Sequence, residues 1–173
     1  MAKAILMCGL PGAGKTVFAK RLAEQRGYKY ISIDDMYKAF NGSDCCRDNK
    51  FDVWMAFWRQ IHLMEEAGQD VVIDTNAPTP DDRNELLNWF TTFEWHLVWI
   101  DADYELCKKN NANRDRIIPE EHLQYMFDFF VRPRPEEDRY ARTHWKNITL
   151  IKNENNHFKV DKIWGYNPYE QII

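Results

Sequence analysis

Gly9-Leu10-Pro11-Gly12-Ala13-Gly14-Lys15-Thr16 is the stretch that decides the fold. It follows a short apolar run and precedes a segment with helical spacing, so a strand, a glycine-rich loop and a helix are expected in that order. Glycine lets backbone N–H groups approach phosphate oxygens without a Cβ in the way, and the N-terminus of the following helix attracts the same anion. The stretch therefore predicts a loop that holds the phosphates of a nucleoside triphosphate.

The side chains at the end of this loop indicate how the nucleotide is held. Lys15 can reach the β- and γ-phosphates, and the hydroxyl group of Thr16 is a ligand for Mg²⁺, which prefers oxygen ligands and keeps several waters. ATP and Mg²⁺ are therefore the expected cofactors. The residues expected to contact the nucleotide are Gly9, Pro11, Gly12, Ala13, Gly14, Lys15 and Thr16, together with Arg114 from a later segment.

Apolar runs alternate with helical patterns along the rest of the chain, which is typical of βαβ units. We therefore expect one α/β domain over residues 1–173, with the P-loop NTPase/kinase fold and a five-stranded, mostly parallel sheet that carries helices on both faces. Residues 108–118 are expected to form a lid and residues 160–173 a C-terminal tail. The expected strands are 3–8, 29–33, 70–73, 95–100 and 147–151, and the expected helices are 15–25, 51–67, 80–90, 104–111 and 120–130.

Composition restricts the possible partners. The chain has 23 Lys and Arg against 27 Asp and Glu, a formal net charge of −4, so any contact with nucleic acid must be local. No stretch is long and apolar enough for a transmembrane helix, and we expect a cytoplasmic protein without a membrane segment. The four cysteines show no zinc-ligand spacing and are typical of reduced thiols: Cys8, Cys45, Cys46 and Cys107.

An acidic pair follows the second apolar strand. Asp34 and Asp35 come after Ile31-Ser32-Ile33, at the carboxyl edge of the sheet, where open α/β sheets bind their ligands. A carboxylate that accepts the proton of the attacking hydroxyl is a recurring part of phosphoryl transfer, and we assign this base role to Asp34. The alternative is that either acid merely caps a helix that begins near Met36, and we favour that role for Asp35.

A third strand, Val71-Val72-Ile73, leads directly into Asp74 and has the form of a Walker B strand. Asp74 is expected in the active site, where it orients a water on Mg²⁺ or holds a substrate group. Thr75 follows it in place of the second acid of a motor ATPase. Transfer to an acceptor therefore fits better than a hydrolysis-driven machine.

Two arginines, Arg114 and Arg116, follow the helix expected at 104–111. Arginine on a lid can close over the triphosphate and stabilise transition-state charge. We assign that role to Arg114. A solvated polar face followed by a turn is the alternative.

Two aromatic stripes recur at helical spacing. Because such stripes more often face a core than a ligand, we expect both to pack inside the protein, with a base-stacking platform as the alternative for the first. The first stripe is Trp54, Phe57, Trp58 and Ile61, and the second is Leu123, Met126, Phe127 and Phe130.

Taken in order, these residues resemble the polynucleotide kinase type of P-loop phosphotransferase, as in phage 5′-hydroxyl kinases. The resemblance runs from Gly9 to about Phe130 and includes Asp74-Thr75-Asn76 and the pair Asn111 and Arg114. It implies Lys15 and Thr16 on the phosphates and metal, Asp34 as general base, Asp74 in the active site and Arg114 as the lid arginine.

The sequence departs from this family at two positions. The acceptor-binding arginine, three residues after the base, falls on Tyr37, and the first arginine of the lid falls on Asn110. Both departures concern the acceptor.

We therefore expect an ATP-dependent kinase whose acceptor is a nucleic-acid hydroxyl, either a 5′-hydroxyl or a hydroxyl on a modified base. A kinase for a small molecule or a sugar nucleotide is the alternative. A nucleotide-dependent switch is less favoured, because the GTPase-like tetrad Asn49-Lys50-Phe51-Asp52 precedes the Asp74 strand instead of ending a later one. Four arginines, interleaved with acids, could contact phosphates of the acceptor or form a solvated face: Arg132, Arg134, Arg139 and Arg142.

Overall fold

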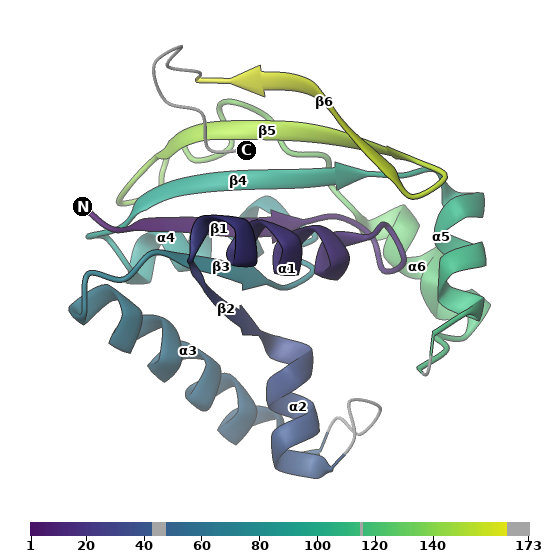
Figure 1. Ribbon diagram of the computed structural model, residues 1–173, viewed down its shortest axis with the longest axis horizontal. Helices are drawn as coiled ribbons and strands as arrows, with labels where there is room; N and C mark the ends of the chain where they lie inside the picture. The colour runs from purple at the N-terminus through teal and green to yellow at the C-terminus, as the bar shows by residue number, and fades with distance from the viewer. Residues whose placement is uncertain (43–47, 115, 166–173) are drawn as a thin grey trace.

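The computed structural model describes residues 1–42, 48–114 and 116–165. Its centre is a six-stranded sheet in the order β2-β3-β1-β4-β5-β6, in which every neighbouring pair is parallel except β5 and β6 (Figure 1). The strands are β1 (Lys3–Cys8), β2 (Lys29–Ser32), β3 (Val71–Asp74), β4 (Glu94–Asp101), β5 (Trp145–Glu154) and β6 (His157–Trp164).

Six helices of the described ranges connect and cover these strands, and the five whose bounds the sequence predicts are all present. Their ends differ from the expected ones by a residue at most. A shorter helix, α2 (Ile33–Asn41), begins three residues before the helix start that was expected near Met36. The helices are α1 (Lys15–Arg26), α2 (Ile33–Asn41), α3 (Lys50–Glu66), α4 (Pro80–Trp89), α5 (Tyr104–Ala112) and α6 (Glu120–Phe129).

Local caps explain where several helices begin. Thr79 forms a reciprocal capping box with Asp82 before Pro80, and Asp103 accepts a hydrogen bond from the N–H of Leu106. The expectation that Asp35 caps a helix near Met36 is wrong. Ser32 is the cap: its hydroxyl accepts from the N–H of Asp35, so the helix begins earlier and Asp34 lies in its first turn.

The alternating residues of β1 divide the core into two clusters. On one face, Leu6 packs with buried residues of α3 and α4, such as Phe57 and Leu87. On the other, Met7 packs with residues of α1, such as Leu22. Because side chains of a strand alternate between its two faces, a strand buried on both sides must be apolar throughout, and β1 is.

A buried ion pair fixes the segment after α6. Arg83 on α4 is fully buried and donates to Glu137 at 2.7 Å, and it also donates to the carbonyl oxygens of Ala77 and Val131. The segment around Arg132-Pro133-Arg134-Pro135 is thus attached to α4 and to the residues that follow β3.

The sheet has one strand more than expected. β6 pairs antiparallel with β5 and occupies part of the segment that was expected to be a tail from residue 160; residues 166–173 lie outside the described part. The reason is composition, because β6 is largely exposed and carries Lys159, Asp161 and Lys162. The turn before it, Asn155-Asn156, has both residues at positive φ (50° and 65°), which is a hairpin signal.

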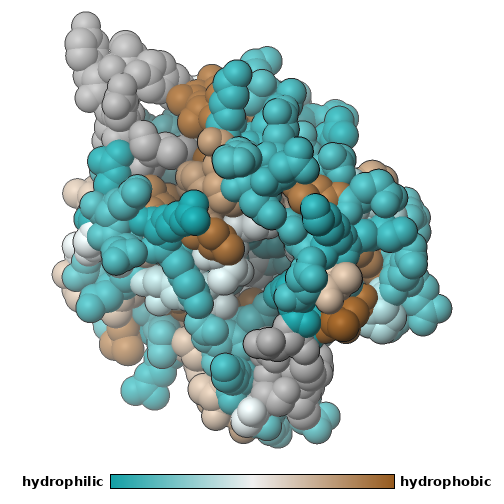
Figure 2. Space-filling model, turned by 45° about the vertical axis from the view of Figure 1, so that its right-hand side comes forward, coloured by the Kyte–Doolittle hydropathy of each residue, from teal (hydrophilic) through white to brown (hydrophobic). Residues whose placement is uncertain are grey.

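The surface shown in Figure 2 is mainly hydrophilic, with small separate hydrophobic areas and a hollow near its middle. Within the described part of the chain, no helix has the length and apolar character needed to cross a bilayer.

Candidate active site

The glycine-rich loop connects β1 to α1 at the carboxyl edge of the sheet, as predicted. Gly12 has a φ of 82°, and a Cβ at this position would collide with the carbonyl group of Cys107 on α5. Residue 12 must therefore be glycine for two reasons, the left-handed backbone and the close approach of α5. The loop is held in place from the side of α5.

Lys15 begins α1 and is buried, with its Nζ donating to the carbonyl oxygen of Leu10 at 2.9 Å. Burial lowers the pKa of Lys15 below that of an exposed lysine, while the carboxylate of Asp74 acts in the opposite direction. The ammonium group is thus kept in a poorly solvated place where a phosphate would be its natural partner. This geometry fits the predicted phosphate contact.

Thr16 and Asp74 lie side by side, although they are far apart in the sequence. The hydroxyl of Thr16 donates to Oδ2 of Asp74 at 2.6 Å, and the phenol of Tyr30 donates to the same oxygen at 2.8 Å. Burial, followed by the Asp74 charge, raises the pKa of the Tyr30 phenol, so it stays protonated and remains a donor. Tyr30 therefore fixes the orientation of the Asp74 carboxylate.

These oxygens fit a Mg²⁺ ion. The described residues include no group of three or more His, Cys, Asp or Glu side chains that could hold a metal, so a dedicated protein cage is not present among them. Mg²⁺ at a nucleotide commonly takes one or two protein oxygens and completes its shell with phosphates and waters. The Thr16 hydroxyl and the Asp74 carboxylate would supply that protein share, and the metal would neutralise charge on the phosphates.

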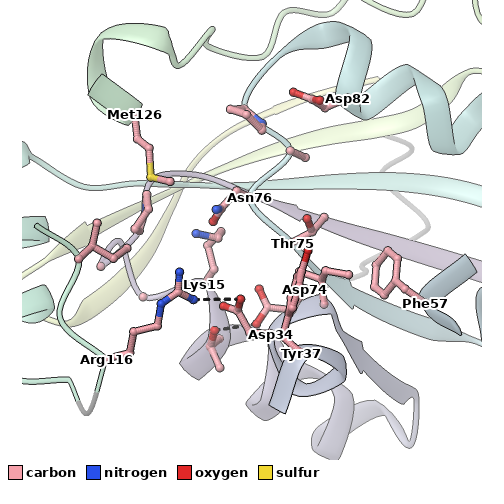
Figure 3. A pocket seen from close by; sticks show the side chains of 18 of the residues that line it. Lys15, Asp34, Tyr37, Phe57, Asp74, Thr75, Asn76, Asp82, Arg116 and Met126 are labelled. Atoms are coloured by element: carbon pink, nitrogen blue, oxygen red, sulfur yellow. Dashed lines mark hydrogen bonds and ion pairs between the residues drawn. The ribbon is translucent and has the colours of Figure 1, made fainter. Parts of the chain in front are cut away.

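Asp34 faces an arginine across the pocket. Nη1 of Arg116 donates to Oδ1 of Asp34 at 3.4 Å, with the carboxylate side chain 43% exposed and the guanidinium 20% exposed (Figure 3). The sequence placed Arg116 beside Arg114 without pairing it to the acid. Two arginines separated by one residue in an irregular loop offer no sequence signal that says which of them reaches Asp34.

Arg114 lines the same pocket, and its positive charge contributes to lowering the pKa of Lys15. Residues on either side of Arg114 are bonded to each other. The side chain of Asn111 donates to the carbonyl oxygen of Ile118 at 2.8 Å and accepts from its N–H at 3.0 Å. The expected lid at 108–118 is therefore divided, because residues 108–112 belong to α5 whereas the described residues 113, 114 and 116–118 lie outside any helix or strand.

One pocket of about 670 Å³ joins these residues to an apolar chamber. Figure 3 shows Asp34 near its middle, between Lys15 and Arg116 on one side and Tyr37 and Phe57 on the other. We call the second side the acceptor chamber. Its lining includes Tyr37, Trp54, Phe57, Trp58, Leu86 and Met126, whereas the phosphate side includes Pro11, Gly12, Gly14, Lys15, Thr16, Asn110 and Arg114.

Only part of each aromatic stripe packs in the core. Phe57 and Ile61 are fully buried in the core, as expected, while Trp54 and Trp58 are half-buried and line the chamber. In the second stripe Leu123 is buried, but Phe127 is 41% exposed, so the expectation of a core position is wrong there. Phe127 packs on Tyr104 at the surface, with ring centroids 5.0 Å apart.

Comparison with known proteins places this site in a family. Residues 5–133, about three quarters of the chain, match the model of a family described as an AAA domain. The chain belongs to this AAA domain family. The matched range includes the phosphate loop, Asp34, Asp74 and Arg114.

One curated protein matches part of this chain. A protein of Thermococcus kodakarensis that is provisionally named an adenylate kinase is 33% identical over 70 residues, which cover 40% of this chain and 39% of that protein. The chain thus matches about two fifths of the length of this curated relative.

Solved structures show the same fold. A sugar kinase from Janibacter sp. HTCC2649 superposes with a TM-score of 0.63 at 15% identity, over 88% of this chain and 86% of the other. The Pnkp1/Rnl/Hen1 RNA repair complex contains a chain with a TM-score of 0.62 at 17% identity, over 75% of this chain and 46% of that one. Identities this low establish the fold alone. The P-loop kinase fold is therefore confirmed, whereas the narrower resemblance to polynucleotide kinases stays a prediction.

Proposed function

We propose that this protein is an ATP-dependent kinase that transfers the γ-phosphoryl group to a hydroxyl of a nucleic acid, either a 5′-hydroxyl or a hydroxyl on a modified base. The observation that carries the proposal is the single pocket in which Asp34 separates the phosphate loop from the acceptor chamber. A hydroxyl group in the chamber would have a carboxylate on one side and the γ-phosphate on the other.

The reaction assigns a role to each group at that junction. The acceptor hydroxyl transfers its proton to the Asp34 carboxylate, the acceptor oxygen forms a bond to the γ-phosphorus, and the bond from that phosphorus to the β–γ bridging oxygen breaks, which releases ADP. Lys15 and Arg114 stabilise the negative charge on the transferring group. Asp74 and Thr16 would hold the Mg²⁺ ion, which would neutralise charge on the phosphates, and Arg116 orients Asp34.

A polymeric acceptor is supported by the surroundings of the chamber. The N–H of Val131 donates to the carbonyl oxygen of Pro78 at 2.9 Å, and Pro78 lines the pocket. The next residues include Arg132 and Arg134, both exposed. These arginines would meet strand phosphates outside the pocket while the reacting group enters it, and the half-buried Trp54 and Trp58 offer ring faces for a base.

A small-molecule or sugar-nucleotide acceptor is the second candidate, and Tyr37 favours it. Tyr37 is buried and occupies the position at which the resembled family has its acceptor-binding arginine. Asp82 and Glu85 also line the pocket, and their charge opposes an anionic group close to the reacting centre. A neutral acceptor would meet neither difficulty.

An acceptor screen tests the proposal. Purified protein with γ-labelled ATP and Mg²⁺ is offered three acceptors: a 5′-hydroxyl oligonucleotide, a 5′-phosphorylated oligonucleotide with an internal hydroxymethylated base, and a mixture of sugars and nucleosides. We expect label on one of the oligonucleotides, and none with the Lys15→Ala variant, which cannot hold the triphosphate. Label on a small molecule alone would replace the first candidate by the second. GTP binding without transfer to any acceptor would indicate a switch.

A further inference from the structure

Two carbonyl groups of the phosphate loop accept hydrogen bonds from asparagine side chains that are distant in the sequence. Nδ2 of Asn110, on α5, donates to the carbonyl oxygen of Gly12 at 2.8 Å. Nδ2 of Asn153, on β5, donates to the carbonyl oxygen of Ala13 at 2.7 Å. Consecutive peptide groups of the loop are therefore held by two different elements of the fold.

These bonds determine the direction of N–H groups as well. In a trans peptide the C=O and the following N–H point in opposite directions, so the contact from Asn153 to the Ala13 carbonyl turns the N–H of Gly14 away from β5 and toward the phosphate side of the pocket. The N–H of Ala13 is already used, since it donates to the carbonyl oxygen of Leu10 at 3.1 Å. The N–H of Gly14 is thus available to a phosphate, next to the N–H groups of the first turn of α1, which lack partners within the helix.

The side chain of Asn153 has a buried oxygen without a partner among the described residues, which fits a positioning role. It is 3% exposed, and its Oδ1 has no hydrogen-bond partner within the described part of the chain. Because a carbonyl oxygen only accepts, the amide must present its nitrogen to Ala13, and this orientation leaves the amide oxygen buried and unpaired. A buried unpaired oxygen is unfavourable, so an amide kept in this orientation is best explained by what its donor does to the loop.

The hairpin of β5 and β6 packs directly behind the loop. A Cβ on Gly14 would lie 2.9 Å from Nδ2 of Asn153 and 3.0 Å from the ring of Phe158 on β6. The same ring contacts Phe18 of α1 edge-to-face, with centroids 5.3 Å apart. The hairpin therefore fills the space on the side of the loop opposite the expected phosphates.

The turn of this hairpin also reaches Asn110. Nδ2 of Asn110 also donates to Oδ1 of Asn156, the second residue of the turn, at 3.1 Å. The phosphate loop, α5 and the hairpin therefore meet at one amide group. The next residue, Asn111, closes the loop that carries Arg114, so the same turn of α5 contacts both the phosphate loop and the lid.

We propose that Asn110 and Asn153 are positioning residues for the nucleotide: they fix two peptide planes of the phosphate loop before ATP binds, so that the N–H of Gly14 faces the phosphates while the N–H of Ala13 stays bonded to Leu10. The β5–β6 hairpin is then part of the ATP site through its support of the loop. This role concerns the donor side and is independent of the acceptor.

Calorimetric titration with tripolyphosphate and with ATP tests this role, because tripolyphosphate contacts the loop without a base or a ribose. One lost hydrogen bond of this kind is worth about 0.5–1.5 kcal/mol, which corresponds to about a 2- to 13-fold weaker affinity. We expect Asn110→Ala and Asn153→Leu each to weaken both ligands by the same factor within this range. Asn110→Gln, which keeps the amide donor, should recover most of the affinity.

Two matched controls separate positioning from folding. Asn113 donates to the carbonyl oxygen of Lys109 at the end of α5, so Asn113→Ala should leave both affinities unchanged. Asn147 is a buried asparagine of β5 bonded to His96, so Asn147→Ala should lower the melting temperature without changing either affinity. If Asn153→Leu does not fold, the Asn110 variants decide.

Three results would overturn the proposal. One is an affinity for tripolyphosphate that stays within twofold of the wild type in the Asn110→Ala variant. Another is a loss for ATP alone, which would place the asparagines against the base or ribose. The third is an equal loss in Asn147→Ala, which would make the effect a general consequence of reduced stability.

Discussion

Replacement of Asp34 by Asn tests the general-base role of this residue separately from nucleotide binding and folding. The change keeps the size of the side chain and removes one negative charge in the first turn of α2. Asp35 lies in the same turn, is exposed and does not line the pocket, so Asp35→Asn removes the same charge from nearly the same place. Any difference between the two variants therefore reports on the position of Asp34 in the pocket.

The structure sets the size of the expected effect. The ion pair of Asp34 with Arg116 spans 3.4 Å, with 43% and 20% of the two side chains exposed, and partly exposed pairs of this kind contribute at most about 1 kcal/mol. Losing the pair can therefore change an equilibrium by about fivefold. A general base contributes about 10² to 10⁴ in rate, so we expect kcat of Asp34→Asn to fall by that factor.

Three measurements on purified variants complete this test: kcat under saturating ATP, the Kd for ATP, and the melting temperature. Asp34→Asn should lose transfer while its Kd for ATP and its melting temperature stay close to the wild type, and Asp35→Asn should match the wild type in all three. The reasoning is refuted if Asp34→Asn keeps transfer within fivefold, or if it loses ATP affinity as severely as Lys15→Ala.

The remaining predictions concern the lid, the core and the thiols. Arg114→Ala should lower kcat by about 10³ or more with little change in KM for ATP, and steady-state kinetics with an effect confined to KM would indicate a ground-state contact instead. Arg83→Ala should cost about 3–5 kcal/mol in denaturant unfolding because Glu137 stays buried without its partner, whereas replacing both by apolar residues should recover most of it; a cost below 1 kcal/mol for the single change would contradict the buried pair. Burial raises the pKa of the Cys8 and Cys107 thiols to about 11, so about one thiol in a thousand is ionised at pH 8. A disulfide reagent should therefore leave both thiols unlabelled until the protein unfolds, which peptide mass spectrometry measures. Fast labelling of the native protein would contradict this prediction.

Much of the fold could be predicted because its signals are local. The expected strand at 3–8 and the five expected helices appear within a residue of their observed ends, since apolar periodicity, Thr79 and Asp103 mark them directly. β6 escaped prediction because an exposed edge strand needs no apolar alternation. Its turn, Asn155-Asn156, was the available signal.

The candidate site could be predicted where a role depends on a motif, and not where it depends on distance in the sequence. Lys15, Thr16 and Asp74 come together because the ends of neighbouring parallel strands meet at one edge. The contact of Tyr30 with Asp74 depends on β2 pairing with β3, an order that no motif states. The contact of Arg116 with Asp34 joins segments to which no such rule applies. The same holds for Asn153, whose contact with the Ala13 carbonyl oxygen joins residues 140 positions apart.

The most direct test of the central claim measures both products of one reaction. Wild-type protein is incubated with ATP, Mg²⁺ and the acceptor that received label in the screen. Phosphorus NMR then quantifies ADP and the phosphomonoester together. A kinase with Asp34 between the phosphates and the acceptor chamber predicts one phosphomonoester on the nucleic acid for each ADP, and neither product from Lys15→Ala. ADP accompanied by inorganic phosphate, with no phosphomonoester on any acceptor, would contradict it.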